Sequence, residues 1–268
     1  MFLFRKKQTL AESGFFRGFI DWHSHILPGV DDGVQTMDEA LQILAEYERL
    51  GIKEVWLTPH IMEDIPNTTG HLRERFAELQ AAYTGNVILH LASENMLDNL
   101  FEERLAKNDL LPIGNHGDHL LVETSYFNPP MGLQNILMRI KAKGYYPLLA
   151  HPERYVYMDK DDYERLKTIG IKFQLNLPSI AGMYRKDVEK KAAWLLKNGL
   201  YDFTGSDLHR LIAWKENVFN RQIPGNTLRM LRNLPGLHPA SAISPEDHAR
   251  IGHGTSGNNS VGSRLEIV

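Results

Sequence analysis

The chain is organised around residues 21–33, which read Asp21-Trp22-His23-Ser24-His25-Ile26-Leu27-Pro28-Gly29-Val30-Asp31-Asp32-Gly33. The apolar lead-in predicts a short buried strand, and the two-residue period of a strand places His23 and His25 on the same side of its end. The Pro-Gly and Asp-Asp-Gly sequences that follow are typical of turns, so Asp32 is expected on a loop just past the strand. Two imidazoles at this spacing can bind one ion. A histidine pair without a ligand is also common, so the rest of the chain is needed to tell whether this pair binds a metal.

Composition narrows the class of protein. The chain has 268 residues, of which 43% are hydrophobic and 24% charged, which is enough for a sizeable core in either one large α/β domain, the favoured alternative, or two ordinary ones. The formal net charge of -3 gives no general electrostatic case for binding nucleic acid or acidic membranes. The chain has no cysteine, so a thiolate zinc site and a cysteine nucleophile are excluded, and any metal has to be held by nitrogen and oxygen. Such a composition suits the cytoplasm.

Both ends of the chain are expected to lie outside the main domain at 19–240. Residues 1–18 are predicted to be an extension outside the core, in which Phe15 and Phe16 either pack down, the favoured alternative, or offer a contact surface. The charges of this segment follow a very short apolar run, unlike a secretory signal. Residues 241–268 are rich in Gly, Ser, Asn and His and are predicted to be disordered. No apolar stretch approaches the roughly 20 residues that cross a bilayer, so stable membrane insertion is not expected.

Seven apolar strands are predicted to alternate with helices. The strands are expected at the lead-in to His23 and at 53–58, 87–92, 120–122, 146–150, 171–175 and 201–204. The helices are expected near 37–50, 71–83, 98–107, 132–143, 161–169 and 186–197, and in pieces over 211–234. This alternation predicts a parallel sheet with crossover helices. Polar side chains follow every strand, which favours a closed barrel with one common mouth, a distorted seven-stranded relative of the TIM barrel.

Metal-capable side chains stand at the ends of six of these strands, and the remaining strand ends in Asn176. The candidates are His23, His25, Asp32, His60, Glu94, Glu123, His151, Asp207 and His209. Nine ligands are too many for one ion, since a mononuclear catalytic zinc uses about three, so the set indicates two or three ions. Imidazole and carboxylate donors suit manganese, iron or zinc, and clusters of this kind serve phosphate-ester hydrolysis. A cation would also offset the cost of burying Glu94 and Glu123 behind apolar runs.

Five motifs together resemble one known family. They are the run from His23 to Gly33, Thr58-Pro59-His60, His151-Pro152-Glu153-Arg154-Tyr155, Gln174-Leu175-Asn176 and Ser206-Asp207-Leu208-His209. Between about Phe19 and Trp214 the chain is similar to the bacterial protein-tyrosine phosphatases of the polymerase and histidinol phosphatase (PHP) superfamily. The resemblance implies a distorted seven-stranded (β/α) TIM-like barrel, three divalent metal ions, often manganese, and hydrolysis of phosphotyrosine. It also implies a phosphotyrosyl protein as partner, commonly a tyrosine autokinase that controls capsule or exopolysaccharide export.

The resemblance assigns roles to the candidate residues. One ion would be held by His23, His25, Glu94 and Asp207, with Glu94 bridging to a second ion bound by Glu123 and His151; a third would be held by Asp32, His60 and His209. Arg154, Asp207 and His209 are expected to be catalytic. The planar guanidinium of Arg154 would bind two phosphoryl oxygens. A metal-bound hydroxide would attack phosphorus directly, and His209 or a metal would assist the phenolate, whose conjugate acid has a pKa near 10.

The chain departs from the family at two places. Asn95 follows Glu94 where relatives usually carry an aromatic or other residue, a change expected to alter the pocket wall. A second arginine that some relatives place beyond the Asp-x-His motif is replaced here by Trp214-Lys215. Arg210 or Lys215 is therefore the candidate for a second phosphate-binding group.

The remaining polar and aromatic residues receive structural interpretations. Asp21 and Asp31 are expected to be structural, Asp31 as a turn residue pointing away from the ions, and Asn176 is expected to orient a ligand. Packing is favoured over a place at the substrate entrance for Tyr126, Tyr155 and Tyr184. No ligand role is expected for His71, His90, His116, His119, His238, His248 and His253.

Three functions stay open, in decreasing order of preference. The first is a metal-dependent protein-tyrosine phosphatase. The second is a phosphatase for a small molecule such as histidinol phosphate, or a phosphodiesterase, of the same superfamily. The third is a metal-stabilised binding module without catalysis. The sequence identifies neither the metal, nor the protein substrate, nor the oligomeric state.

Overall fold

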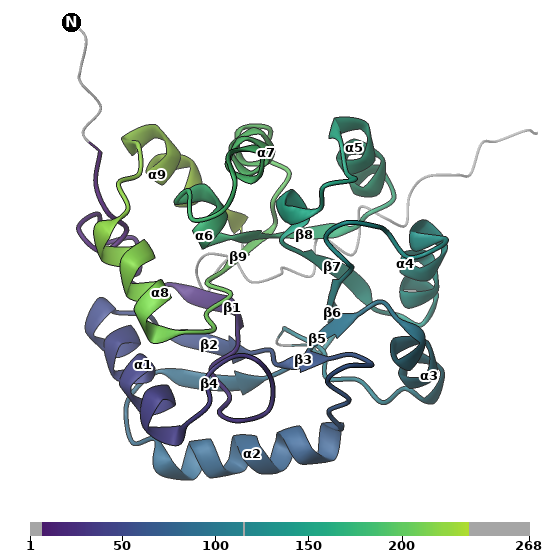
Figure 1. Ribbon diagram of the computed structural model, residues 1–268, viewed down its shortest axis with the longest axis horizontal. Helices are drawn as coiled ribbons and strands as arrows, with labels where there is room; N and C mark the ends of the chain where they lie inside the picture. Colours follow the sequence, from purple (N-terminus) through teal and green to yellow (C-terminus); the bar gives the residue numbers. More distant parts are fainter. Residues whose placement is uncertain (1–6, 115, 236–268) are drawn as a thin grey trace, which may run out of the picture.

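In the part of the chain that the structure describes, the strands lie in two sheets, and all the strand pairs are parallel. The computed structural model describes residues 7–114 and 116–235 (Figure 1). A three-stranded sheet has the order β1-β2-β4, and a six-stranded sheet has the order β3-β5-β6-β7-β8-β9. The strands are β1 (Ile20–Ser24), β2 (Glu54–Leu57), β3 (His60–Ile61), β4 (Ile88–Leu91), β5 (Glu94–Met96), β6 (His119–Glu123), β7 (Tyr146–Ala150), β8 (Lys172–Asn176) and β9 (Phe203–Gly205). All seven predicted strands are present.

Two of the predicted strands continue, after a break, into a short second strand that the sequence did not predict. Thr58-Pro59 separates β2 from β3, and Ala92-Ser93 separates β4 from β5. Proline has no backbone N–H and so interrupts a ladder. Beyond the breaks the chain joins the larger sheet, where His60 of β3 pairs in register with Glu94 of β5. The break therefore places two candidate ligands side by side.

Helices surround the strands on the outside (Figure 1). The α-helices are α1 (Met37–Leu50), α2 (Thr69–Ala82), α3 (Asn99–Lys107), α4 (Leu133–Ala142), α5 (Lys160–Thr168), α6 (Leu177–Ile180), α7 (Lys186–Lys197), α8 (Leu211–Lys215) and α9 (Gly225–Leu231), and two short helices are η1 (Pro152–Arg154) and η2 (Glu216–Asn220). The first begins where the Thr36 side chain accepts a hydrogen bond from the Glu39 amide and ends at Gly51 with φ of 83°. None of the described helices is long and apolar enough to span a membrane.

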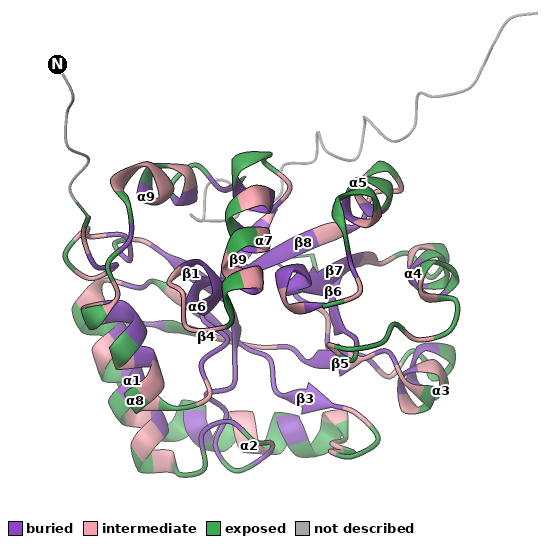
Figure 2. Ribbon diagram, turned by 45° about the horizontal axis from the view of Figure 1, so that its top comes forward, coloured by how far each residue is buried: buried purple, intermediate pink, exposed green. Residues whose placement is uncertain are grey.

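The hydrophobic core has two parts. The larger part fills the space between strands and helices, and the strands other than β4 are buried along most of their length (Figure 2). The smaller part lies between strands of both sheets and consists of Ile20, Trp22, Trp56, Ala92, Ile113, Leu121, Leu148, Ala150 and Phe203. The ring of Trp22 stacks on Trp56 at 5.9 Å and meets Phe203 edge-on at 4.9 Å between centroids. The two sheets therefore share one interior.

The end of β1 also contacts the chain that follows β9. The Asp207 amide donates to the His23 carbonyl at 2.8 Å, and the His25 amide donates to the Leu208 carbonyl at 3.0 Å. A Cβ atom on Gly205 would lie 2.5 Å from the Cβ of His23, so only glycine permits this approach. The fold is thus α/β with parallel strands in a curled sheet, as predicted in its coarse features.

The amino-terminal segment corrects one expectation. From Lys7 onward it packs on the domain, with Leu10, Phe15 and Phe16 buried in the main core. The favoured alternative, in which Phe15 and Phe16 pack down, is therefore confirmed, although the described part of the segment does not lie outside the core. The ring of Phe16 lies 6.3 Å from that of Trp214, and the segment forms an antiparallel bridge with the chain before α9. The tail predicted at 241–268 lies outside the described residues.

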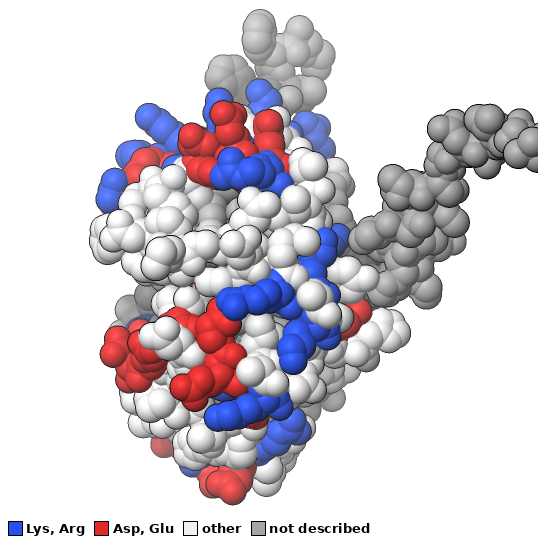
Figure 3. Space-filling model, turned by 90° about the vertical axis from the view of Figure 1, so that its right-hand side faces the viewer, with Lys and Arg blue, Asp and Glu red and all other residues white. Residues whose placement is uncertain are grey.

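The face formed by α3, α4 and α5 carries acidic and basic side chains next to one another (Figure 3). Arg139 of α4 pairs with Glu102 of α3, and Arg165 pairs with Asp162 within α5. These are exposed pairs of the kind that contributes little to stability. The site described below lies elsewhere, at the carboxyl ends of the strands.

Candidate metal centre

All nine candidate ligands come together at the carboxyl ends of the strands. They form four overlapping groups whose nitrogen and oxygen atoms lie within 4.8 Å of one another. The groups are His25, Asp32, His60 and His209; His23, His25 and Asp207; His23, Glu94 and His151; and His60, Glu94 and Glu123. Among the residues that the structure describes, these groups contain the nine predicted residues and no other. Parallel strands bring their carboxyl ends to one edge, which explains how positions far apart in sequence meet.

Glu94 lies at the centre of the cluster. One of its carboxylate oxygens is 3.1 Å from Nε2 of His23, and the other is 3.0 Å from Nε2 of His151. The Nε2 atoms of His23 and His25 face each other at 3.0 Å. Both ring nitrogens are also directed at the Glu94 carboxylate. A single cation between them could accept the lone pairs of both imidazoles and of the carboxylate.

The cluster passes a direct test of whether a metal fits. Nδ1 of His60 and Oε1 of Glu123 are buried and lie 3.0 Å apart, yet neither has a hydrogen-bond partner. Buried polar atoms without partners are rare in proteins because leaving them unpaired costs free energy. Imidazole nitrogen and carboxylate oxygen are ligands that manganese, iron and zinc accept. The donor set therefore fits a centre of divalent ions.

Electrostatics in the cluster favours positive charge. Burial raises the pKa of Glu94, but the neighbouring imidazoles of His23 and His60 outweigh it and hold the pKa well below its ordinary value. Burial likewise lowers the pKa of His23, and the carboxylates of Glu94 and Asp207 outweigh this effect and raise the pKa to about 9. Carboxylates that remain ionised although they are buried need compensating cations.

Asp31 holds one of the histidines in place. Its Oδ2 lies 2.8 Å from Nδ1 of His25 and accepts a hydrogen bond from the His60 amide at 3.0 Å, while its Oδ1 accepts from the Gly33 amide at 2.9 Å. Asp31 is thus structural, as predicted, but it points toward the centre rather than away from it. A carboxylate on the second nitrogen of an imidazole fixes the ring's orientation and tautomer.

Strand β8 supplies two further supporting groups. Asn176 donates to Oδ2 of Asp207 at 2.6 Å, consistent with its predicted orienting role, and Oε1 of Gln174 lies 2.9 Å from Nδ1 of His23. A role for Gln174 was not predicted, although its two-residue spacing from Asn176 places both residues on one side of the strand. Asp207 and His151 both have a left-handed backbone, with φ of 49° and 33°. Non-glycine residues in this conformation are uncommon and concentrate at functional sites.

Arg154 stands beside the cluster, clamped between two aromatic rings. Its Nη1 donates to Oδ2 of Asp207 at 2.9 Å, and its guanidinium carbon lies 4.3 Å from the ring centroid of Tyr126 and 4.7 Å from that of Tyr184. Burial lowers the pKa of Arg154, but Asp207 outweighs this and raises it, so the residue stays cationic. Tyr155, the third candidate tyrosine, donates to the Ala150 carbonyl and is packing only.

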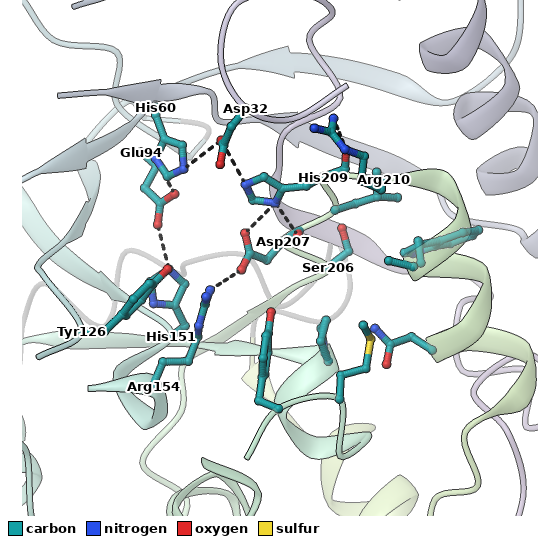
Figure 4. A pocket seen from close by; sticks show the side chains of 17 residues that line it. Asp32, His60, Glu94, Tyr126, His151, Arg154, Ser206, Asp207, His209 and Arg210 are labelled. Carbon is teal, nitrogen blue, oxygen red and sulfur yellow. Dashed lines mark hydrogen bonds and ion pairs between the residues drawn. The ribbon is translucent and has the colours of Figure 1, made fainter. Parts of the chain in front are cut away.

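These groups open into one cavity of about 380 Å³, called here the inner cavity (Figure 4). Seven of the polar residues that line it are Arg154 and six members of the ligand cluster: Asp32, His60, Glu94, His151, Asp207 and His209. The apolar lining residues include Pro178, Met183, Leu208, Ala213 and Trp214. The cavity thus combines a charged wall with an apolar one.

The structure shows where the residues at the two departures from the family lie relative to the inner cavity. Arg210 lines the inner cavity and donates to the Gly33 carbonyl, whereas Lys215 pairs with Glu46 at 3.5 Å and does not line it. Asn95 is buried beside Arg104, from which it accepts a hydrogen bond at 2.9 Å. Because Asn95 does not line the cavity, the expectation that it alters the pocket wall is wrong.

Residues predicted to be structural lie away from the ligand cluster or behind it. Asp21 accepts hydrogen bonds from the Tyr47 hydroxyl at 2.6 Å and the Ser206 amide at 2.7 Å. His90 and His119 each pair with a single carboxylate, at 3.0 and 2.7 Å. His71 and His116 are exposed, and His238, His248 and His253 lie outside the described residues.

By fold and site, this is an α/β protein whose strand ends form a candidate polynuclear metal centre next to an arginine. The chain belongs to the family described as "Capsular polysaccharide synthesis, CpsB/CapC", whose model matches residues 19–216. The resemblance read from the motifs is thereby confirmed.

Curated relatives agree with this assignment. The tyrosine-protein phosphatase YwqE of Bacillus subtilis is 28% identical over 198 residues, covering 72% of this chain and 78% of the relative. The tyrosine-protein phosphatase CpsB of Streptococcus agalactiae serotype V is 30% identical over 216 residues, covering 72% of this chain and 83% of the relative. The fold matches a crystal structure from a study of YwqE and of CpsB from Streptococcus pneumoniae, called there unique metal-dependent tyrosine phosphatases. The TM-score is 0.68 at 24% identity, covering 81% of this chain and 87% of the other.

Proposed function

We propose that this protein is a metal-dependent protein-tyrosine phosphatase whose substrate is a phosphotyrosyl protein, a bacterial tyrosine kinase of capsule or exopolysaccharide export. The observation that carries the proposal is the inner cavity, in which nine clustered nitrogen and oxygen ligands stand beside the clamped Arg154. Membership of the CpsB/CapC family and the phosphatase names of its relatives support the same activity.

Three divalent ions are proposed to occupy the centre, manganese in preference to iron or zinc. The ligands would be His23, His25, Glu94 and Asp207 for the first ion, Glu94, Glu123 and His151 for the second, and Asp32, His60 and His209 for the third. Support comes from the four overlapping groups, in which Glu94 belongs to two and Asp32, His60 and His209 stand together. When bound, such ions lower the pKa of a coordinated water and neutralise charge on phosphoryl oxygens.

The chain's own residues would recognise both halves of phosphotyrosine. Arg154 offers a rigid fork of N–H donors to two phosphoryl oxygens, and its contacts with Tyr126 and Tyr184 hold the fork in place before substrate arrives. Met183, Leu208 and Trp214 form the apolar wall against which the phenyl ring would pack.

His209 would assist the departing phenolate through the ion that it helps to hold, because its Nδ1 faces the backbone oxygen of Asp207 and only Nε2 is left for the site. Its side chain is 28% exposed, more than the other four imidazoles of the cluster, and it lines the inner cavity. Its Nδ1 lies 3.0 Å from the backbone oxygen of Asp207, which fixes the ring. A phenol with a pKa near 10 is a good leaving group, so modest assistance is sufficient.

The architecture proposed for this function is a distorted seven-stranded (β/α) barrel. The hydrogen bonds between the end of β1 and the segment after β9, together with the core shared by both sheets, support closure. The domain is proposed to span 19–240, with 1–18 as an N-terminal extension whose described part packs on it and 241–268 as a tail. The cytoplasm is the proposed compartment, because a chain without cysteine suits a reducing environment.

The test is phosphate release by protein purified without chelator and analysed for bound metal. A phosphotyrosyl peptide, a phosphoseryl peptide of the same sequence, and histidinol phosphate are compared. We expect kcat/KM to be highest for the phosphotyrosyl peptide, by about tenfold or more, because only its ring reaches the apolar wall. Preference for histidinol phosphate would instead assign the protein to the small-molecule phosphatases of the superfamily.

The non-catalytic alternative makes a different prediction. A binding module would retain a phosphotyrosyl peptide without releasing phosphate, and His151→Ala would leave that binding intact. Peptide retention without turnover by metal-loaded protein would therefore overturn the enzymatic proposal.

A further inference from the structure

A second cavity adjoins the inner one on the far side of Arg154. This outer cavity has a volume of about 510 Å³ and shares four lining residues with the inner cavity: Tyr126, Arg154, Met183 and Tyr184. Three of the four form the stack in which the guanidinium lies between two rings. The stack is therefore a partition with a cavity on either side, and a chain lying across it would enter both.

The outer cavity is predominantly apolar. The side chains that line it but not the inner cavity include Phe127, Val156 and Val188. Phe127 is 67% exposed and Val156 is 41% exposed, so two of the six exposed large hydrophobic side chains among the described residues gather at this one place. Exposed apolar side chains that cluster in a hollow belong to a binding surface more often than exposed apolar side chains that are scattered over the surface.

Charge in the outer cavity is already neutralised. Arg185 is bound to Asp187 through two hydrogen bonds of 2.9 and 3.1 Å, and Arg154 is bound to Asp207. The lining includes no carboxylate. The Val156 amide donates to the Tyr126 carbonyl at 2.9 Å, so the backbone on one side is fixed without a ligand. The cavity is thus suited to an uncharged, apolar occupant.

We propose that the outer cavity is a specificity subsite that binds a bulky apolar side chain next to the phosphotyrosine in the substrate polypeptide. The inference rests on the proposed function, because the inner cavity has to hold the phosphotyrosine. This occupant is proposed because the inner and outer cavities adjoin at Arg154, so one substrate chain can enter both. A residue tethered to the phosphotyrosine is held within reach of the outer cavity, so its apolar side chain is buried there at a small additional entropic cost.

The test compares three phosphotyrosyl peptides that differ only in the two residues flanking the phosphotyrosine, which are leucine, serine or glutamate. For the wild-type protein we expect kcat/KM for the leucine peptide to exceed that for the serine peptide by about tenfold, as expected for burial of one large side chain. Phe127→Ser and Val156→Ser should each narrow this ratio toward one. Met138→Ser is the matched control, since Met138 is an exposed apolar residue on α4 that lines neither cavity, and its ratio should equal that of the wild type.

Other outcomes overturn the inference in recognisable ways. Equal rates for leucine and serine peptides leave the outer cavity without a role in specificity. Preference for the glutamate peptide would assign recognition to Arg185. If Phe127→Ser changes the oligomeric state in sedimentation but not the ratio, a second copy of the chain is the occupant. Failure of the proposed function is distinguishable, because then free phosphotyrosine and all three peptides remain unhydrolysed.

Discussion

Two sets of histidines in this molecule differ in what their nitrogens face. His90 and His119, on β4 and β6, each lie against one carboxylate, Glu54 or Asp118, and need nothing more. At the strand ends the imidazoles of His23, His25, His60, His151 and His209 crowd around shared carboxylates, and two ring nitrogens meet at 3.0 Å.

This difference distinguishes a structural histidine from a histidine that binds a metal. A structural histidine is satisfied by a hydrogen bond within the protein, so a cation would add nothing. The clustered histidines and carboxylates leave buried atoms such as Oε1 of Glu123 without a partner, and a set of cations resolves all these deficits together. Removing the metal, or one side chain from the clustered set, should therefore change turnover, whereas removing a structural histidine should not.

Chelation is expected to have the largest effect. Treatment with EDTA should lower turnover of a phosphotyrosyl peptide by about 10³-fold or more, since the reaction loses its source of nucleophile and charge neutralisation. It should also lower the thermal midpoint, because ions that bind only the folded state stabilise it. Added manganese should restore both quantities. Full activity of protein shown by elemental analysis to be free of metal would contradict the assignment.

Substitution of one histidine from each set tests the comparison directly. His151→Ala should reduce kcat/KM by about 10³-fold because it removes a proposed ligand. His90→Ala should leave turnover unchanged and lower the free energy of unfolding by about 1 kcal/mol, the loss of one partly exposed hydrogen bond. Peptide kinetics and urea denaturation measure the two effects. A similar loss of turnover in both variants would show that the two sets do not differ in function.

Arg154 should be distinguishable from the other cations. Arg154→Ala should lower kcat/KM by about 10²-fold, and Arg154→Lys should recover only part of it, because lysine lacks the planar fork. Lys215→Ala is the control, since Lys215 pairs with Glu46 outside the inner cavity, and its kinetics should match those of the wild type. The role assigned to Arg154 fails if lysine replaces it without loss.

The smallest expected effect comes from the carboxylates behind the histidines. Asp31→Asn should weaken metal binding about 10- to 100-fold, because His25 loses the group that fixes its orientation. Asp118→Asn makes the same change behind His119, where no ion is proposed, and should leave metal content and turnover as in the wild type. Equilibrium dialysis against manganese gives both affinities. If Asp31→Asn binds manganese like the wild type, Asp31 is a turn residue only.

The order of strands and helices and the identity of the nine clustered residues were predictable from the sequence. Alternating apolar runs specify parallel strands, and a histidine or carboxylate just past such a run, as at His60 or Glu94, is brought to the common edge whatever the details of the helices. His119 shows why a histidine alone is insufficient, since it begins a strand and lies away from the site.

Only the tertiary structure decided which neighbours these side chains have. Several features of the site depend on contacts between segments far apart in sequence or on the conformation of a tight turn. They are the breaks after β2 and β4, the approach of Asp31 to His25, the contact of Oε1 of Gln174 with Nδ1 of His23, and the position of Asn95 beside Arg104. Local propensity determines which element a residue belongs to, because it acts within a few neighbouring residues. Which polar groups face each other at the strand ends depends on register and packing, and these exist only once the whole chain is folded.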